Sequence, residues 1–541
     1  MAATATRRGF TVGSLLAAGA LAGRVIGGRP TQAQPTTPAA GLHVTLAGPV
    51  TAIPTLDPAL VRDNATMMVA RQLFRGLLSV DPSLALRPAL AASVTVDAHA
   101  RVFSVRLREG ATFAGGRAVL AEDVAASFAR ALDPATAGGD ASALAGVGQL
   151  AGIAGADDVL AGRTGRLAGI AVSGPRDLTI ALSAPDAAFP GKLASVAASI
   201  VDTVSGGPVE TRGSGPFGVA PSPSSDILTM ARRMYPYEGH GTVSSLSFLL
   251  GASATNPANL LQAGSIDIAT GLPADQAALL ADPASGAGSP TVVRTPAFSL
   301  LYLALSPHSA PLDDLHIRRA IQVGFPWGRL AEAAGASVQP ARGVIAPGML
   351  GRSWDAAIPA FDPDLARAEI GRSRYGAAEH VPPIPVFTGQ TTRSDPLRNV
   401  GVALQEVLGE RLGLRIEPVS VAWGDFLAGL PAGRFPTHSL TWVADYPDPS
   451  AFLDVLFGSG SPDNYAGYRS EAFDAVLAEA RAMPEEGTRA GLFARAQQML
   501  IDDAIVVPIA FDIGYTAFRT GIGGVPVTPI GLGGLESIHG S

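Results

Sequence analysis

Two spacings of apolar residues alternate along the chain. Spacings of three and four residues are typical of helices, and alternation at every second residue is typical of half-buried strands. Helices are predicted over 67–78, 121–132, 317–323, 403–412 and 489–502. Strands are predicted over 43–47, 102–107, 178–182, 266–269, 299–305, 414–418 and 505–511. Because strands and helices follow one another in turn, the pattern indicates an α/β architecture.

The composition is that of a globular chain without cysteine. Of the 541 residues, 47% are hydrophobic and 16% are charged, so we expect a large core and no general disorder. The length corresponds to about three domains of ordinary size. The absence of Cys excludes disulfides, thiolate-bound zinc, iron–sulfur clusters, a Cys nucleophile and a lipid-modified Cys.

The charge of the chain is acidic. The net charge is −7, and it falls to −11 without residues 1–33, which hold four Arg and no acid. No basic stripe occurs, so we expect no nucleic acid partner and no attachment to an anionic membrane surface. Lys192 is the only lysine in the sequence, and nothing in the pattern explains this bias.

The first 33 residues have the pattern of an export signal. Arg7 and Arg8 precede Phe10 and a mild apolar run over 12–22, which is shorter than the ~20 residues that span a bilayer. The pattern resembles a twin-arginine signal; the alternative is an ordinary secretory signal in which the second Arg is incidental. Residues 34–41 are predicted to be a flexible leader. Because the sequence has no Cys to carry a lipid anchor, a periplasmic location is favoured.

No motif of a catalytic or metal site occurs in the sequence. The eight His are scattered, and none is four residues from another. Neither a Gly-x-Ser-x-Gly elbow nor a Walker loop is present. The adjacent carboxylates Asp313-Asp314 and Asp502-Asp503 do not converge on one point. We therefore expect no enzymatic activity, no metal and no cofactor.

The segment Gly213–Gly218 matches the Gly-x-Gly-x-x-Gly pattern of dinucleotide-binding folds. That pattern requires a buried strand before it and a helix after it. Residues 209–212 make a poor buried strand, and Pro221 and Pro223 exclude a helix. We predict a tight turn between two strands instead.

Six groups of short motifs follow one another in the order found in one transport family. They are Thr55–Pro58 with Gln72–Leu78, Phe103–Phe113 with Ala121–Val124, Gly213–Phe217, Pro311–Asp314 with Ile317–Ala320, Trp442–Leu453, and Asn464–Asp474. The most specific is Trp-Val-Ala-Asp-Tyr-Pro-Asp-Pro at 442–449. On these motifs the chain resembles the extracytoplasmic solute-binding proteins of peptide-type ABC importers, solute-binding protein family 5, over residues 42–515.

The resemblance implies a two-lobed periplasmic-binding-protein fold, type II, of the large peptide-binding cluster. Lobe one would comprise 42–78, 208–292 and 511–541, with an extra subdomain at 79–207, and lobe two would comprise 293–510. The hinges would fall at 294–298 and 508–512. The ligand would bind in the cleft between the lobes, and hinge closure would bury it.

In peptide-binding members of this family, the acid that matches Asp445 pairs with the α-ammonium group of the ligand. The resemblance therefore places Asp445, Trp442, Tyr446 and Tyr302 in the ligand site. A carboxylate that faces a closed cavity is costly unless a cation meets it, so such a site selects ligands with a free amino terminus. The alternatives are that Asp445 or Asp448 only caps the turn and that Trp442 is a core residue.

The resemblance implies a monomeric periplasmic protein that captures short peptides and delivers them to the permease subunits of an ABC importer in the inner membrane. The sequence departs from the family pattern at Arg232–Tyr237, Ser306, Leu312 and Gly324–Gly328, which leaves the ligand class open. The alternatives are a nickel–chelator complex, an opine or a sugar on the same fold, an exported hydrolase, and a structural or chaperone-like protein.

Overall fold

The computed structural model describes most of the chain. The described residues are 42–48, 50, 53–233, 241–251, 256–282, 288–328, 330, 335–341, 343–350, 360–390 and 400–540. The signal predicted at 1–33 and the leader predicted at 34–41 lie outside them. None of the helices in these residues is both long and apolar enough to cross a membrane.

In the described residues, predicted lobe two contains five strands and two groups of helices. Its strands are β13 (Ser299–Leu305), β14 (Val338–Pro340), β15 (Ile384–Gln390), β16 (Ile416–Ala422) and β17 (Thr437–Val443). Its helices are α8 (Leu315–Val323), α10 (Pro363–Arg372), α11 (Val400–Leu404), α12 (Glu410–Leu412), α13 (Trp423–Gly429), α14 (Ser450–Phe457), α15 (Glu471–Ala482) and α16 (Glu486–Asp502). One apolar cluster packs under α13 to α16, and a second packs under α8 to α12.

Lobe one is built around a mixed set of strands. They are β1 (Leu42–Ala47), β8 (Phe217–Ala220), β9 (Ile227–Arg232), β10 (Val243–Leu249), β11 (Ile268–Ala269) and β12 (Thr291–Pro296). The helices are α1 (Asn64–Leu73), α6 (Pro257–Gln262) and α7 (Ala274–Ala281). Near the end of the chain, β19 (Ile522–Gly523) pairs with β22 (His539–Gly540), and β20 (Val527–Thr528) pairs with β21 (Gly531–Leu532).

The segment 79–207 contains a separate antiparallel sheet with its own apolar cluster. Its strands, in spatial order, are β4 (Ala91–Val96), β5 (Val102–Leu107), β7 (Asp177–Ala181) and β6 (Ile170–Val172). Its helices are α2 (Ala121–Leu132), α3 (Val147–Leu150), α4 (Ala156–Leu160) and α5 (Phe189–Lys192). A hairpin of β2 (Leu78–Val80) and β3 (Leu86–Pro88) precedes this sheet.

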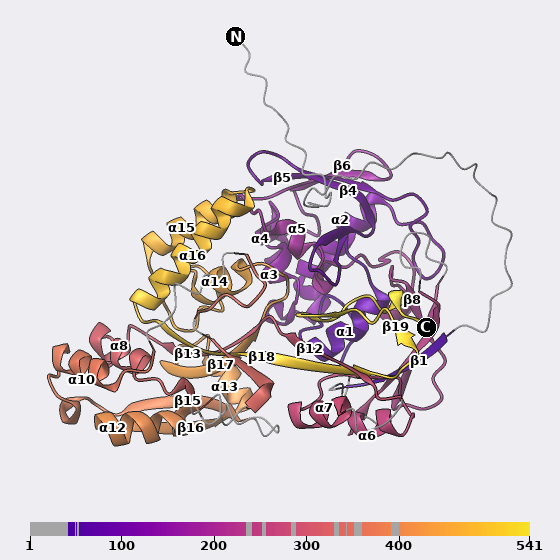
Figure 1. Ribbon diagram of the computed structural model, residues 1–541. Coiled ribbons are helices and arrows are strands. Elements are labelled where there is room, and N and C mark those ends of the chain that lie inside the picture. Colours follow the sequence, from indigo (N-terminus) through magenta and orange to yellow (C-terminus); the bar gives the residue numbers. More distant parts are fainter. Residues whose placement is uncertain are drawn as a thin grey trace, which may run out of the picture.

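One long strand, β18 (Val506–Phe518), runs from lobe two into lobe one, and Figure 1 shows it in yellow between the two halves of the molecule. It pairs with β13 and β14 at its start and with β11 and β12 at its end. Within the described residues this joins twelve strands into one sheet, ordered β16-β15-β17-β13-β18-β11-β1-β10-β9-β8, with β12 and β14 also on β18. The two chain segments that connect the predicted lobes lie next to each other, because the Ala297 amide donates to the Asp512 carbonyl at 2.8 Å. The division into lobes, subdomain and hinges stays a prediction.

Several predicted elements are confirmed with the bounds that the sequence indicates, namely the strands over 102–107 and 299–305 and the helix over 121–132. The strand β5 alternates between exposed and buried residues, as its pattern requires. All seven residues of β13 are buried, because both faces of this central strand are covered. The strand predicted over 505–511 is longer than expected and continues to Phe518.

The helix predicted over 67–78 is wrong at both ends. It begins at Asn64, where the Asp63 side chain accepts from the Thr66 amide at 2.8 Å and caps it. It ends at Leu73, because the Gly215 amide donates to the Leu73 carbonyl at 2.8 Å. The apolar spacing continues past this residue, but the chain itself turns into the β2 hairpin.

The turn predicted at 213–218 is also corrected. The segment follows a short 3-10 helix, Val209–Thr211, and leads into β8, so only one strand flanks it. A Cβ atom at Gly215 would lie 2.5 Å from the carbonyl carbon of Leu73. The glycine is therefore needed for the close approach of this loop to the end of α1.

Candidate ligand-binding site

Asp445 lies two residues after the end of β17, where predicted lobe two meets the predicted subdomain. The Ala444 amide donates to the Phe298 carbonyl at 2.8 Å and fixes the end of the strand. Asp445 Oδ2 accepts a hydrogen bond from Gln149 Nε2 at 2.8 Å. Gln149 lies on α3, 296 residues away in sequence, and its side chain is buried. The Asp445 carboxylate therefore forms a hydrogen bond between the two predicted lobes.

Some surroundings of Asp445 disfavour its ionised form, and others favour it. Burial raises the pKa of Asp445 above its usual value, and the hydrogen bond from Gln149 works against that rise. The charge of Asp463 raises the pKa further, whereas Arg62 and Arg71 lower it. Gln149 Oε1 is buried without a hydrogen-bond partner in the described part of the chain. The Asp445 carboxylate and the amide oxygen of its hydrogen-bond partner are therefore the two acceptors of this contact.

The other predicted site residues have unequal surroundings. Trp442 Nε1 donates to the Ala451 carbonyl at 2.9 Å, and the half-buried ring packs against the apolar cluster of lobe two. Tyr446 is buried, with its hydroxyl 3.2 Å from Ser450 Oγ. Tyr302 is 2% exposed inside the same cluster. Asp445 and Tyr446 contact residues from the predicted subdomain, namely Gln149 and Lys192.

Tyr302 and Asp448 have structural partners within lobe two. The Tyr302 ring makes edge contacts with His438 and Phe457, and burial raises its pKa. Asp448 accepts from both terminal nitrogens of Arg489, at 2.6 and 2.9 Å, and from the Ser450 amide at 3.0 Å. Asp448 therefore pairs with Arg489 and accepts from the first amide of α14, whereas the side-chain partner of Asp445 comes from α3.

Lys192 marks a second contact between the lobes, which the sequence did not indicate. Its Nζ lies 2.7 Å from Asp186 Oδ2 and 5.5 Å from the centroid of the Tyr446 ring. The charge of Asp454, on α14, also acts on Lys192. Nearby, the Ala187 amide donates to the Arg481 carbonyl on α15 at 2.8 Å. We call this set of contacts the lobe seam.

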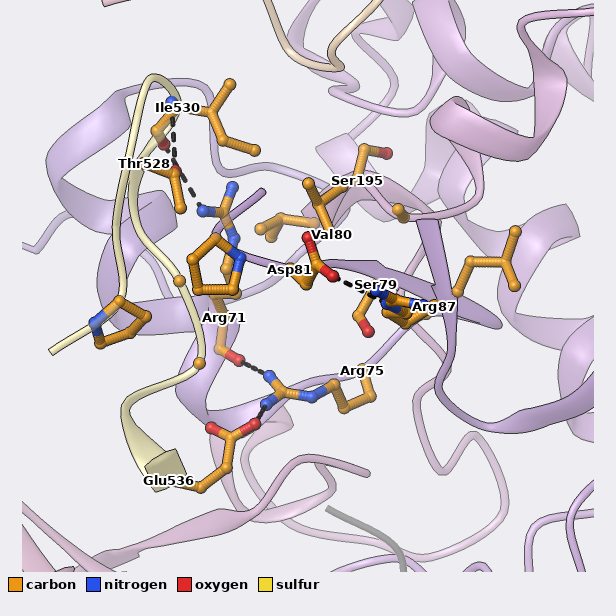
Figure 2. A pocket seen from close by; sticks show the side chains of 18 of the residues that line it. Arg71, Arg75, Ser79, Val80, Asp81, Arg87, Ser195, Thr528, Ile530 and Glu536 are labelled. Carbon is orange, nitrogen blue, oxygen red and sulfur yellow. Dashed lines mark hydrogen bonds and ion pairs between the residues drawn. The ribbon is translucent and has the colours of Figure 1, made fainter. Parts of the chain in front are cut away.

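A cavity of 340 Å³ lies in lobe one, between the end of α1, the β2–β3 hairpin and the segment 526–537. Figure 2 shows its charged groups. Arg75 pairs with Glu536, and Arg87 Nε pairs with Asp81 Oδ2 at 2.7 Å. Arg71 also lines the cavity and reaches toward the segment that carries Ile530.

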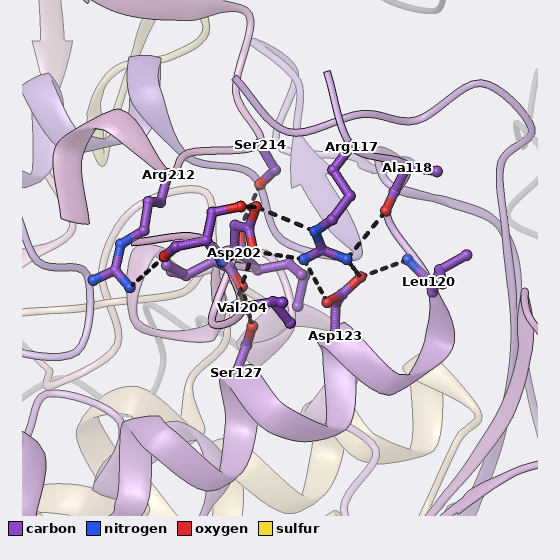
Figure 3. A network of polar contacts seen from close by, with 12 residues as sticks. Arg117, Ala118, Leu120, Asp123, Ser127, Asp202, Val204, Arg212 and Ser214 are labelled. Carbon is purple, nitrogen blue, oxygen red and sulfur yellow. Dashed lines mark hydrogen bonds and ion pairs between the residues drawn. The ribbon is translucent and has the colours of Figure 1, made fainter. Parts of the chain in front are cut away.

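A second buried polar cluster is complete in itself. Arg117 Nη2 lies 2.7 Å from carboxylate oxygens of both Asp123 and Asp202 (Figure 3). Asp123 also accepts from the Leu120 amide at 2.8 Å, and Asp202 from the Ser205 amide at 3.0 Å. This cluster ties α2 to the segment after Ile200 and offers no open group for a ligand. Among the described residues, no group of three or more His, Asp and Glu could hold a metal ion.

Sequence reasoning missed Gln149 and Lys192 as residues of the lobe boundary and Arg71 as a residue of the cavity in lobe one. Gln149 lies in a stretch whose pattern is weak, and Arg71 falls inside a helix prediction without any motif of its own. Lys192 was noticeable only as the single lysine. Each of these side chains contacts segments that are far away in the sequence.

Comparisons with known proteins agree with these features. The family model described as bacterial extracellular solute-binding proteins, family 5 middle, matches residues 85–464. Di/tripeptide-binding protein 2 of Pseudomonas aeruginosa is 27% identical over 508 residues, 88% of this chain and 90% of that protein. The probable deoxycholate-binding periplasmic protein YgiS of Escherichia coli is 25% identical over 487 residues, 87% and 89% of the two chains.

A solved structure shows the fold. The murein tripeptide-binding protein MppA of Escherichia coli superposes with a TM-score of 0.73 and 21% identity, over 93% of this chain and 99% of that one. The predicted fold class, an α/β two-lobed periplasmic-binding-protein fold, is confirmed.

Proposed function

Since this chain belongs to family 5 of the bacterial extracellular solute-binding proteins, we propose that it captures short peptides with a free amino terminus between its two lobes. The single observation that carries this proposal is the pair of acceptors at the lobe boundary. Asp445 provides a half-buried carboxylate, and Gln149 Oε1 is a buried acceptor with no partner among the described residues. An ammonium group supplies three N–H donors and a positive charge, which matches both acceptors at once.

The electrostatics of Asp445 support a cationic ligand group. A carboxylate out of water is costly unless a cation pairs with it, and the residue in contact with Asp445 is a neutral amide. Arg62 and Arg71 act on Asp445 through their charges without forming an ion pair with it in the described residues. A bound α-ammonium group would complete the pairing and stabilise the lobes together.

Binding by closure follows from the position of these groups. Asp445 and Tyr446 belong to predicted lobe two, whereas Gln149 and Lys192 belong to predicted lobe one. A ligand that touches both sides stabilises the closed arrangement by its differential affinity for it. We propose that the loaded monomer then delivers the peptide to the permease subunits of an ABC importer at the inner membrane. Among the residues of the proposed ligand site, Tyr302 and Trp442 would support the walls of the site from the apolar cluster of predicted lobe two. Tyr446 would form the edge of the site at the lobe boundary.

The location is proposed from the relatives and the sequence. YgiS is named as a periplasmic protein, and Arg7 and Arg8 predict export by the twin-arginine route. A lipid anchor on Cys is not expected, because the printed sequence contains none. Replacing both Arg with Lys should leave the precursor inside the cell if the route is correct. Unchanged export would favour the ordinary secretory pathway.

The test of the ligand class is a thermal-shift and calorimetric screen of di- to hexapeptides. Free peptides should raise the melting temperature, and amino-acetylated ones should not. Asp445→Asn should weaken binding, by ~2–5 kcal/mol if the ligand fully desolvates the ion pair, because the acid loses its charge. Asp425→Asn is the matched control, since it removes the same charge from an exposed position on α13 of lobe two.

Deoxycholate provides the discriminating ligand, because one relative is named for it. It carries a carboxylate and no ammonium group. A melting shift with deoxycholate alone, or equal shifts with free and acetylated peptides, would show that Asp445 is not an ammonium anchor.

A further inference from the structure

Asp454 lies on α14, at the lobe seam. Its side chain is 16% exposed, and its Oδ2 atom accepts a hydrogen bond from Arg481 Nη1 at 3.2 Å. The Oδ1 atom is buried without a hydrogen-bond partner in the described residues. The Arg481 side chain is itself 37% exposed. The carboxylate therefore has one long contact with a half-exposed cation, and its second oxygen has no compensation.

The other side of the seam is the segment 186–192 of predicted lobe one. The Ala187 amide donates at 2.8 Å to the backbone carbonyl of Arg481, the residue whose side chain contacts Asp454. Ala188 is 3% exposed and belongs to the apolar cluster of predicted lobe two. If the lobes part, this segment leaves the surface of α14 and α15, and water reaches Asp454.

The charged and titratable groups around Asp454 come from both sides of the seam. They are Lys192 and Asp186 of predicted lobe one, Tyr446 and Asp448 in the turn before α14, Arg481 on α15 and Arg489 on α16. Both Lys192 and Arg489 are already paired with acids of this set. Arg481 and Lys192 favour the ionised form of Asp454, and the acids oppose it. Burial, which also opposes the ionised form, has the largest effect.

We propose that the lobe seam is a proton-dependent latch, in which Asp454 takes up a proton from solvent as the lobes close and returns it as they part. An unpaired oxygen in the closed seam is costly for the carboxylate and much less costly for the neutral acid. Mildly acidic surroundings therefore favour the closed form. This inference concerns the closing movement and does not depend on which solute is bound. No motif of the sequence singled out Asp454.

The size of the effect follows from the linkage between protonation and closure. Burial in the closed seam raises the pKa of Asp454 from the ordinary 3.8, which the open form should regain, to about 6. Because the closed form binds the proton more tightly, this contribution to closure is fully present below about pH 4 and is lost as the pH rises through about 6. The ratio of closed to open form should be about tenfold higher at pH 5 than at pH 7.

Hydrogen exchange of the Ala187 amide measures this ratio, because that amide donates across the seam. The exported chain is exchanged without ligand at pH 5 and at pH 7, and each rate is expressed as a protection factor relative to an unfolded chain at the same pH. Mass spectrometry of overlapping fragments isolates the Ala187 amide. Amides of the buried strand β13 report global unfolding and separate it from parting of the lobes.

The wild type should protect the Ala187 amide about tenfold more strongly at pH 5 than at pH 7. In Asp454→Asn and Asp454→Ser, whose side chains cannot ionise, the protection should be equal at the two pH values. Glu479→Gln removes an exposed acid from α15 and should keep the pH dependence of the wild type. Melting temperatures show that each variant is folded, and the Ser variant replaces the Asn variant if the latter is not.

Two results would overturn the latch. One is equal or weaker protection of the Ala187 amide at pH 5 than at pH 7 in the wild type. The other is a pH dependence that persists in the variants without the Asp454 carboxylate. Neither result bears on peptide capture, which the peptide screen tests separately.

Discussion

A saturating peptide should slow the acylation of Lys192 by about a hundredfold. Lys192 is the only lysine in the sequence, so an amine-reactive reagent reports on this one side chain and on the terminal α-amino group. Its side chain is 17% exposed, held 2.7 Å from Asp186 and covered by the Tyr446 ring from the other lobe. Reaction therefore requires the lobe seam to open.

The magnitude follows from the linkage between binding and closure. A ligand that binds the closed form stabilises it by RT ln(1 + [L]/Kd), which is about 2.7 kcal/mol at a hundred times Kd. When opening and closing are fast relative to acylation, the reaction rate follows the population of the open form. Burial disfavours the charged amine, but Tyr446 and Asp186 outweigh it and raise the pKa of Lys192. The closed form therefore has less of the neutral amine that reacts, which slows its acylation further.

The assay is a time course with an acylating reagent, followed by mass spectrometry of the peptide that contains Lys192. The α-amino group serves as the internal reference, because ligand should not change its rate. In Asp445→Asn, the same protection should need a higher peptide concentration. An equal Lys192 rate with and without a saturating ligand would refute the idea that ligand binding closes this seam.

Three further predictions concern stability. Burial raises the pKa of Asp454 to about 6, so this acid binds its proton more tightly in the folded state. Its contribution to the free energy of unfolding is therefore lost as pH rises from about 4 through 6. In urea unfolding, Asp454→Asn should lack this loss of stability with pH. Arg489→Met leaves Asp448 buried without its cation and should cost about 3–5 kcal/mol in the same assay, whereas a cost below about 1 kcal/mol would contradict a buried pair. Gly215→Ala should destabilise by about 1–3 kcal/mol because its Cβ meets the backbone at the end of α1. Its control, Gly491→Ala, adds a Cβ within α16 that has no atom within 4 Å and should be neutral or stabilising in a thermal melt.

Local sequence patterns predict correctly those elements whose ends are set by neighbouring residues in the chain. The alternation in β5 and the apolar run of β13 predict both strands with their observed ends, because the burial of each residue follows its position on the strand. The same rule failed for α1. Its end depends on the Gly215 loop, which is 142 residues further along the chain and has no part in the helical spacing.

The candidate site divides in the same way. Asp445 is proposed from sequence because it belongs to a dense motif near the end of one strand, and its role in the ligand site stays a prediction. Its partner Gln149 could not be proposed in this way, since a short helix in an Ala- and Gly-rich stretch has no pattern that points to lobe two. Arg71 and Lys192 are likewise ordinary cations in sequence, and only their three-dimensional neighbours make them distinctive.

In the proposed function, Gln149 would link recognition to closure, because its amide contacts the carboxylate that the ligand cation would pair with. Its Nε2 gives Asp445 one neutral hydrogen bond, while its Oε1 remains without a partner in the described structure. A neutral donor compensates a desolvated carboxylate less than a cation does. An ammonium group between the two side chains would satisfy both of them and would strengthen the contact between the lobes. A ligand without that group would leave the neutral hydrogen bond from Gln149 as the main compensation of the Asp445 charge. Selection of the amino terminus and stabilisation of the closed form would therefore depend on the same two residues.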